Sequence, residues 1–408
     1  METLIPEVQR EIEKIAKDHG FKNFTITITN TAANETDGYI GVIEAGCIKD
    51  KNSDKTISLV IKKAPLSINF RKQFPLREAF EREIYIYEKV FPEFLSFQTI
   101  HNVAKVFNNF PKVYGCIDDE YKETLIMENL KEAGFKLTDR TKPLDANHLN
   151  LVLKTYAKLH AISYGMKKLE PEKFKLLTER INTNIMMGHG GHNRNEEVNG
   201  TLFKSCFSAI RDRPDLISEL KKYEQSAAHN FFLYITQLYK DQYAVFTHSD
   251  CWSANLLFKY GDESKPYLPT DISIIDWQTS AVSHPVHDIS YFFFITAGKA
   301  DLHNYKSYLR SYYEALCENL SDFGIEAKSF YPFELLEEHW KKYSIIGFIM
   351  CLVMLKQSLS STKTRDLPKM ADNGESLYNL GGTDDDSQLY EQRMTDLVEF
   401  LIENKLIQ

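Results

Sequence analysis

The first 130 residues combine one helical pattern with several strand-like segments. Val8, Ile12 and Ile15 recur at helical spacing, and Gly20 follows them, which predicts a helix over the first 19 residues. Alternating or β-branched runs predict five strands, and an apolar stripe predicts a helix between the third and the fourth. The strands are expected at residues 24–28, 39–48, 56–62, 111–117 and 124–127, and the helix at about residues 76–90.

Beyond residue 130 the pattern becomes mostly helical. Strand-like residues 244–277 interrupt it. Helices are expected at residues 147–165, 204–239, 302–320 and 333–359. The order of elements predicts an α+β protein with a β-rich N-terminal lobe at residues 1–130 and a mainly helical C-terminal lobe at residues 131–408. We expect small ligands to bind in a cleft between the lobes.

Composition and charge narrow the classes of protein that fit this pattern. A length of 408 residues favours two packed lobes, and an apolar fraction of 43% is that of a globular protein. A formal charge of −8 argues against a nucleic-acid partner. The apolar stretch at residues 345–355 is shorter than the roughly 20 residues that cross a bilayer, so it predicts a buried helix.

The cysteines and the start of the chain bear on the compartment. The six cysteines are scattered without a Cys-x-x-Cys pair, which is typical of reduced thiols and not of a disulfide framework or a zinc site. Residues 1–6 contain no basic segment followed by an apolar run, so no secretory signal is expected. We therefore expect a cytoplasmic monomer without a membrane span.

The strand-like segment at residues 244–277 carries the strongest chemical signal. Asp250 and Asn255 lie five residues apart after a predicted strand, which is the spacing of a kinase catalytic loop. In such a loop the aspartate accepts the substrate proton and the asparagine binds magnesium. A second apolar strand then ends at Asp276, as a second magnesium ligand would require. His248 precedes Asp250 by two residues and belongs to the same segment.

Two charged residues of the first lobe are candidates to bind nucleotide phosphates. Lys62 ends a predicted strand and shares a face with Val60, and the neighbouring Lys63 remains an alternative. Glu83 is our choice to hold the lysine because it adjoins the apolar stripe of the next helix. Other acidic side chains of that helix, which are also candidates, are Glu78 and Glu81.

Two further segments are candidates for contacts with ATP. Gly38 and Gly41 could fold over the phosphates, although their match to a glycine-rich loop is poor and an ordinary turn explains them as well. The residues at the lobe boundary could bind adenine through their backbone. They are Met127, Glu128, Asn129 and Leu130.

Simpler interpretations apply to several other residues. The histidines and glycines at residues 188–192 predict a loop, and His160 predicts a core side chain hydrogen-bonded to the catalytic loop. The aromatic side chains at residues 231–234 suit either an apolar substrate or the core.

A serine hydrolase is excluded because adjacent residues cannot form a relayed triad. A protein kinase is disfavoured because the chain lacks the His-Arg-Asp and Asp-Phe-Gly pair and an Ala-Pro-Glu-like end to an activation segment.

The motifs together resemble the ecdysteroid kinase-like family, which is related to choline kinases and aminoglycoside phosphotransferases. The resemblance extends over roughly residues 35–300 and is carried by residues 80–84, 128–131, 134–140, 157–161, 248–255, 276–278 and 285–291. It implies a bilobal protein-kinase-like fold. The chain departs from the family at Ser249, where glycine is frequent, and at Trp277, where phenylalanine is usual.

The resemblance also implies roles for individual residues. Asp250 would be the catalytic base, and Asn255 and Asp276 would bind Mg²⁺. Lys62 paired with Glu83 would contact the phosphates of ATP. His248 and Asp288 would support the catalytic loop.

The expected activity is an ATP- and Mg²⁺-dependent transfer of the γ-phosphate to a hydroxyl of a small alcohol. The family suggests an ecdysteroid or a plant-derived xenobiotic as the acceptor. Only about eight residues separate Asp276 from Pro285, which is too few for a peptide-docking loop. The alternatives are a non-catalytic ligand-binding protein with a kinase fold and a choline- or ethanolamine-type kinase.

Overall fold

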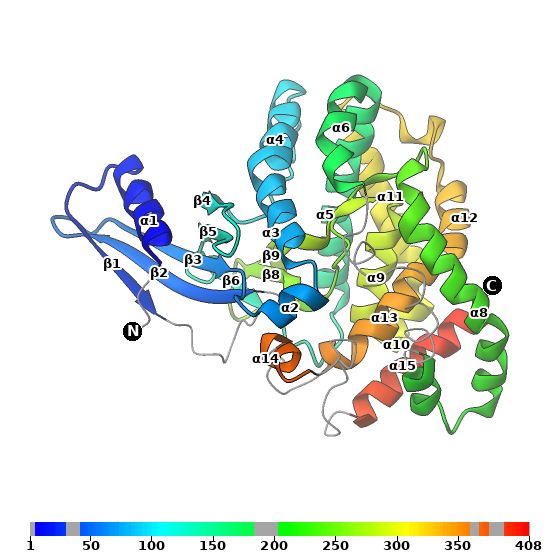
Figure 1. The fold of residues 1–408 in the computed structure, drawn as a ribbon. Coiled ribbons are helices and arrows are strands. Elements are labelled where there is room, and N and C mark those ends of the chain that lie inside the picture. Colours follow the sequence, from blue (N-terminus) through cyan, green and yellow to red (C-terminus); the bar gives the residue numbers. More distant parts are fainter. Residues whose placement is uncertain (1–4, 30–40, 183–202, 360–366, 375–386, 408) are drawn as a thin grey trace.

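The structure is a computed structural model that describes residues 5–29, 41–182, 203–359, 367–374 and 387–407. A twisted antiparallel sheet forms one end of the molecule and a group of helices forms the other (Figure 1). This arrangement confirms the predicted α+β, bilobal kinase-like fold. No helix of the described ranges is long and apolar enough to cross a membrane.

The N-terminal sheet has five antiparallel strands in the order β1-β2-β3-β5-β4. Strand β3 lies at its centre, paired with β2 on one side and β5 on the other. The strands are β1 (Phe24–Thr29), β2 (Val42–Asp50), β3 (Thr56–Lys63), β4 (Val113–Ile117) and β5 (Thr124–Glu128). They agree closely with the five predicted strands, because each segment has the alternating or β-branched pattern of a sheet.

The two faces of this sheet have different partners. Helix α1 (Pro6–Asp18) covers one face and packs its apolar side chains against Leu59 and Ile61 of β3. Because successive side chains point to opposite faces, Lys62 lies on the other face, toward helix α3 (Leu76–Tyr85). Lys63 lies on the same face as Ile61 and forms an ion pair with Glu44 of β2 at 2.6 Å. The two neighbouring lysines therefore face opposite sides of the sheet.

The helical segment after β3 is longer than the apolar stripe predicts. Helix α2 (Ile68–Gln73) precedes α3, and a π-helical turn at Ile86–Val90 connects α3 with α4 (Phe91–Ile100). Pro92 has no N–H and cannot continue the hydrogen-bonding pattern of the preceding turn. The π-helical turn lies directly before it, and the chain stays helical instead of ending near residue 90.

The remaining helices form the C-terminal part, and most of their apolar side chains belong to one core. Besides the helical residues 203–209, they are α5 (Ala146–Leu169), α6 (Pro171–Thr178), α8 (Pro214–Gln237), α9 (Val286–Thr296), α10 (Lys299–His303), α11 (Tyr305–Asp322), α12 (Phe333–Tyr343), α13 (Ile345–Ser358), α14 (Leu367–Asp372) and α15 (Ser387–Glu403). Residues 345–355 lie in the buried helix α13, as predicted. The predicted loop at residues 188–192 lies outside the described residues.

Two small sheets interrupt these helices and shape the candidate site. One contains β6 (Phe135–Leu137), β8 (Leu256–Tyr260) and β9 (Pro269–Ile274). The other pairs β7 (Val245–Thr247) with β10 (Ala281–Ser283). Strands β7, β8 and β9 confirm the predicted strand-like character of residues 244–277. The sequence did not predict β6 and β10, whose three residues are too few to show a period.

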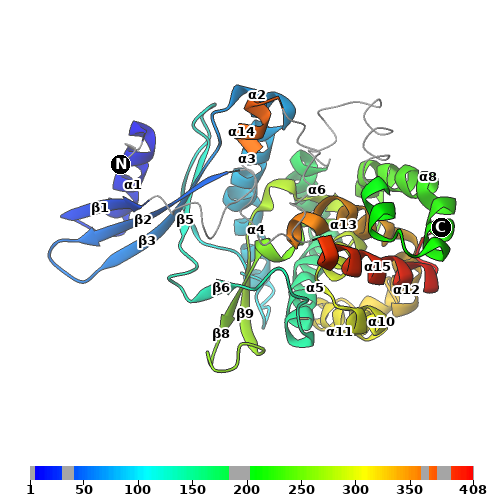
Figure 2. The same cartoon turned by 90° about the horizontal axis from the view of Figure 1, so that it is seen from below.

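A short helix near the C-terminus contacts the N-terminal lobe. Helix α14 lies beside α2 in both views (Figures 1 and 2). The Asp372 carboxylate accepts hydrogen bonds from the Ser67 hydroxyl at 2.6 Å and from the Asn69 amide at 3.3 Å. Leu367 and Met370 of α14 are buried. The two lobes are therefore linked by a contact that is distant in sequence.

Helices α9 and α13 approach each other so closely that one position must be glycine. A Cβ atom on Gly347 would lie 2.5 Å from the Ser290 carbonyl carbon and 2.7 Å from the Tyr291 nitrogen. Both are backbone atoms of α9 and cannot move without shifting the helix. Gly347 therefore sets the distance between α13 and the helix that supports the candidate site.

We predict that Gly347→Ala lowers the free energy of unfolding by about 1–3 kcal/mol, since the added methyl group overpacks this contact. Ser344→Ala is the matched control, because the buried Ser344 hydroxyl has no hydrogen-bond partner within the described parts of the chain. We expect this control to leave stability nearly unchanged. Denaturant unfolding measures both variants, and an equal effect of the two would contradict the close helix contact.

Candidate active site

The loop after β7 brings Asp250 and Asn255 into direct contact. The Asn255 amide nitrogen donates to Asp250 Oδ2 at 2.8 Å and to the Asp250 backbone carbonyl at 3.0 Å. Burial and, to a smaller extent, the nearby Asp276 carboxylate raise the pKa of Asp250 to about 7. The hydrogen bond from Asn255 acts in the opposite direction. The loop thus fixes one carboxylate next to an amide whose oxygen can still bind a ligand.

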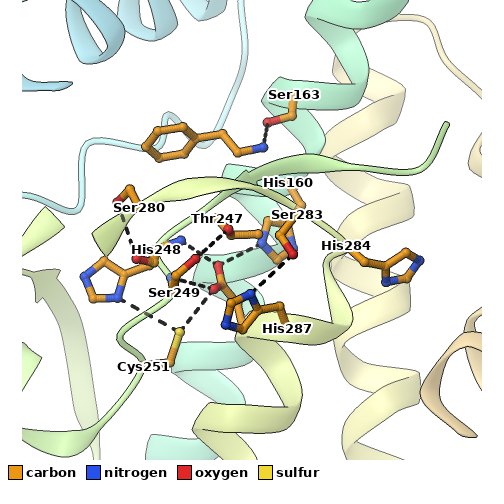
Figure 3. Close-up of polar contacts among 12 residues, drawn as sticks. His160, Ser163, Thr247, His248, Ser249, Cys251, Ser280, Ser283, His284 and His287 are labelled. Atoms are coloured by element: carbon orange, nitrogen blue, oxygen red, sulfur yellow. Dashed lines mark hydrogen bonds and ion pairs between the residues drawn. The ribbon is translucent and has the colours of Figure 1, made fainter. Parts of the chain in front are cut away.

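Asp288 at the start of α9 holds the backbone of this loop. Its carboxylate accepts from the backbone N–H groups of His248 at 2.8 Å and Ser249 at 2.9 Å. The Asp288 carboxylate also has hydrogen bonds with the Cys251 thiol at 3.2 Å and with His160 Nε2 at 3.2 Å (Figure 3). Burial acts to raise the pKa of Asp288, but the hydrogen bond and charge of His160 outweigh it and lower the pKa to about 2.

His160 contacts the loop only indirectly. Its Nδ1 is 2.9 Å from the Tyr312 hydroxyl and its Nε2 bonds Asp288, which in turn binds the loop. His160 is fully buried, as expected of a core side chain. It therefore reaches the loop through its hydrogen bond to Asp288.

His248 lies beneath the loop and is fully buried. Its Nε2 is 3.0 Å from the Ile275 carbonyl oxygen, and its ring packs edge-on against Trp277. Burial lowers the pKa of His248, so the ring stays neutral and Nε2 donates to the carbonyl. His248 therefore ties the loop to the segment that carries Asp276, and this position fits the supporting role that the family resemblance implies.

Ser249, where the family that the chain resembles frequently has glycine, has an unusual backbone geometry. Ser249 has a φ of 67°, in the left-handed region that favours glycine. Its oxygen is 2.9 Å from the Thr247 hydroxyl, and its N–H is bonded to Asp288. These contacts hold Ser249 in a backbone conformation that glycine adopts more readily than serine. This preference gives a physical reason why glycine is frequent at this position in the family that the chain resembles. Asp276 has a similar φ of 65°.

Lys62 joins the two lobes through two carboxylates. Its Nζ lies 2.6 Å from Glu83 Oε2 on α3 and 2.8 Å from Asp276 Oδ1. The other oxygen of Glu83 accepts from the Trp277 N–H at 3.2 Å. Burial acts against the charge of Lys62, but attraction to Asp276 and Glu83 outweighs it, and its pKa lies above the ordinary value. Lys62 therefore stays positively charged at the junction of the lobes.

The other acidic candidates on α3 do not bind Lys62. Glu81 pairs with Arg77 at 2.7 Å, and Glu83 alone is the α3 carboxylate bonded to Lys62. The neighbouring Arg82, also buried, donates to the Ser280 carbonyl at 2.9 Å. Helix α3 is thus fixed to the segment after Asp276 by two adjacent side chains. The sequence did not predict the contact of Arg82.

Gly41 lies against Lys62 at the start of β2. A Cβ atom on Gly41 would be 3.1 Å from Lys62 Cγ, so the absence of a side chain leaves room for the lysine. Gly38 lies outside the described residues.

The predicted adenine-binding segment continues from the end of β5. Met127 and Leu130 are buried, and the Asn129 N–H bonds the Ser58 carbonyl at 3.2 Å. The Glu128 N–H bonds the Lys112 carbonyl at 2.8 Å. The Leu130 N–H donates no hydrogen bond to the residues that the structure describes, so it can serve a ligand. This backbone group lies where the sheet passes into the helical lobe.

The donor set of Asn255 and Asp276 fits Mg²⁺, which prefers oxygen ligands and keeps several waters. The Asn255 amide oxygen and Asp276 Oδ2 accept no hydrogen bond within the described ranges, and the Ile275 N–H bonds the Asn255 carbonyl at 3.0 Å. The described residues contain no group of three or more His, Cys, Asp or Glu side chains that could hold a metal on their own. Phosphate oxygens would have to complete such a site.

A match to a protein-family model shows which family the chain belongs to. The ecdysteroid kinase-like family model matches residues 36–325. The chain belongs to the ecdysteroid kinase-like family. A search of curated proteins finds no match. The matched part of this ecdysteroid kinase-like protein contains every described candidate above, whereas helices α12–α15 lie beyond it. Kinase-like families of this type generally use ATP and Mg²⁺, which supports a phosphotransferase.

A further contact at the site was not predicted. The Tyr291 hydroxyl on α9 donates to Asp250 Oδ1 at 3.3 Å. A usable signal was present in the sequence, because Tyr291 follows Asp288 by three residues and helical residues at this spacing share a face.

We predict that Asp288→Asn destabilises this ecdysteroid kinase-like protein by about 3–5 kcal/mol at pH 7, since several buried donors lose a charged acceptor. The folded-state pKa of Asp288 is depressed, so its contribution is complete above pH 4 and is lost as the pH falls toward 2. The stability difference between the two proteins should therefore shrink below pH 4.

Denaturant unfolding at pH 7, 5 and 3 measures this difference. Asp119→Asn is the control, because Asp119 is exposed and its side chain has no hydrogen bond or ion pair within the described ranges, and we expect less than about 0.5 kcal/mol there. A variant as stable as the wild type at pH 7 would contradict the supporting role of Asp288.

Proposed function

We propose that this protein is an ATP- and Mg²⁺-dependent kinase that phosphorylates a hydroxyl group of a small alcohol. The observation that carries the proposal is the contact of Lys62 with both Glu83 and Asp276 at the lobe junction, close to the Asp250–Asn255 pair. Phosphoryl transfer needs these parts: a cation for the phosphates, oxygen ligands for the metal and a carboxylate near the attacking hydroxyl. One lobe supplies the first part and the other lobe supplies the rest.

In this proposal residues 1–130 bind the nucleotide and residues 131–408 carry the catalytic loop and the acceptor site. The backbone at Met127–Leu130 would bind adenine, and Lys62 would bind the phosphates while Glu83 orients it. Gly41 would leave space near the phosphates. Asn255 and Asp276 would hold Mg²⁺, which supplies positive charge that offsets the charge of the phosphate oxygens.

The reaction would then follow from the position of Asp250. Its carboxylate orients the acceptor hydroxyl and takes the hydroxyl proton as the acceptor oxygen bonds to the γ-phosphorus. The bond between that phosphorus and the β–γ bridging oxygen breaks, and ADP leaves with the bridging oxygen. The proton passes from Asp250 to solvent when the products leave. His248 and Asp288 hold the loop and do not contact the reacting atoms.

The acceptor is proposed from the family and from the nature of nearby side chains. An ecdysteroid or a plant-derived xenobiotic would suit the half-buried aromatic side chains of α8, of which Tyr234 packs edge-on against Tyr343 at 5.0 Å. We further propose that the protein acts as a cytoplasmic monomer.

An ATP-consumption screen tests the activity. The panel contains ecdysteroids, phenolic glucosides and choline, and each compound is run with the wild type and with Asp250→Asn. We expect one class to be phosphorylated by the wild type and the variant to be at least about 100-fold slower, because the base is lost. Phosphorylation of choline alone would favour a choline-type kinase. ATP consumption in neither form with any compound would favour a non-catalytic ligand-binding protein.

The two adjacent lysines provide a matched test of the nucleotide site. We predict that Lys62→Met lowers kcat/KM for ATP by about 100-fold or more, since a charge-assisted contact to the transferred group is lost. Lys63→Met should stay within about threefold, because Lys63 pairs with Glu44 on the opposite face of the sheet. Initial rates at varied ATP concentration distinguish the two. An equal loss in both variants would contradict the assignment of Lys62.

A further inference from the structure

Both oxygens of the Asp250 carboxylate have a hydrogen-bond donor. Asp250 Oδ2 accepts from the Asn255 amide at 2.8 Å, which is a contact within the loop itself. Asp250 Oδ1 accepts from the Tyr291 hydroxyl at 3.3 Å, which is a contact from helix α9. Torsion about the last bond of an aspartate is broad, so a single donor leaves the carboxylate free to turn. The Trp252 side chain also hydrogen-bonds Asp250, so donors from the loop and from α9 together fix the plane of the carboxylate.

Helix α9 contacts the loop on one side and helix α13 on the other. Asp288, one turn before Tyr291, binds the backbone N–H groups of His248 and Ser249. Behind the helix, a Cβ atom on Gly347 would lie only 2.7 Å from the Tyr291 nitrogen, so α13 prevents α9 from moving away. Tyr291 therefore projects its hydroxyl toward Asp250 from a rigid support.

The Tyr291 hydroxyl is suited to be a permanent donor. Tyr291 is fully buried, and burial together with the charge of Asp250 raises its pKa well above the ordinary value. The hydroxyl thus keeps its proton, and within the described residues Asp250 is its hydrogen-bond acceptor. A distance of 3.3 Å is long for an O–H···O bond, and contacts of this kind often tighten when the substrate is bound.

We propose that Tyr291 is a positioning residue of the phosphotransfer site, whose hydroxyl holds Asp250 Oδ1 so that the carboxylate presents its remaining lone pairs to the acceptor hydroxyl. This inference rests on the proposed function. A purely structural tyrosine would satisfy its hydroxyl in the core and affect only stability. Tyr164 is such a residue, since it is buried in α5 and donates to the Tyr243 carbonyl at 3.0 Å.

The test compares Tyr291→Phe with Tyr164→Phe, using ATP and the acceptor found by the screen. Each variant loses one buried hydroxyl with one hydrogen bond, so we expect similar small losses in melting temperature. Tyr291→Phe should lower kcat by about 5- to 30-fold, the equivalent of a hydrogen bond to a charged group, with KM for both substrates within about twofold. Tyr164→Phe should keep kcat within about twofold.

A double-mutant cycle with Asp250→Asn adds a readout that protein stability does not affect. If Tyr291 acts through Asp250, Tyr291→Phe should lower the residual rate of Asp250→Asn by less than about twofold. An unchanged kcat in Tyr291→Phe, an equal loss in Tyr164→Phe or full additivity in the cycle would overturn the role of Tyr291 alone. A wild type that turns over no acceptor would overturn both this role and the proposed function.

Discussion

A buried lysine between two carboxylates is the interaction on which the rest of the site depends. Lys62 is buried, and such a charge is tolerated only when partners offset the loss of hydration. Glu83 and Asp276 supply these partners from the two lobes. With Asp250 nearby, the junction contains three carboxylates and one lysine, an excess of negative charge. This imbalance gives a physical reason why a cation should accompany the anionic nucleotide.

The loop that carries Asp250 is held at several points, two of them on helix α9. Asp288 binds the loop backbone, His248 ties the loop to Ile275, and Tyr291 contacts the Asp250 side chain. The left-handed geometry at Ser249 and Asp276 is retained because the surrounding hydrogen bonds fix it. The close contact at Gly347 places α13 directly behind this helix. The contacts of α9 with the loop and with α13 therefore contribute both to the stability of the protein and to the preorganisation of the site.

Much of this arrangement could be predicted from the sequence. The period of two in a strand placed Lys62 and Val60 on one face, and the order of Lys62, Glu83, Asp250 and Asp276 indicated the two-lobed fold. The contacts of Glu83 and Asp276 with Lys62 agree with the arrangement expected from that order.

Other features depend on tertiary contacts that no local pattern encodes. Lys63 pairs with Glu44 of a neighbouring strand, on the face opposite Lys62. The three-residue strands β6 and β10 exist because neighbouring strands pair with them, and α14 contacts α2 through residues distant in sequence. The spacing from Asp288 places Tyr291 on the right face of α9, but its contact with Asp250 also requires the loop to fold back onto that helix. Each of these features depends on contacts between segments that are distant in the sequence.

The most direct measurement is a calorimetric titration of ATP into the wild-type protein, once with excess Mg²⁺ and once with EDTA. If Asn255, Asp276 and Lys62 form one magnesium–nucleotide site, ATP should bind at least about tenfold more tightly with Mg²⁺, a difference of about 1.4 kcal/mol. Equal affinity in the two conditions, or no binding of ATP with Mg²⁺ present, would contradict the account.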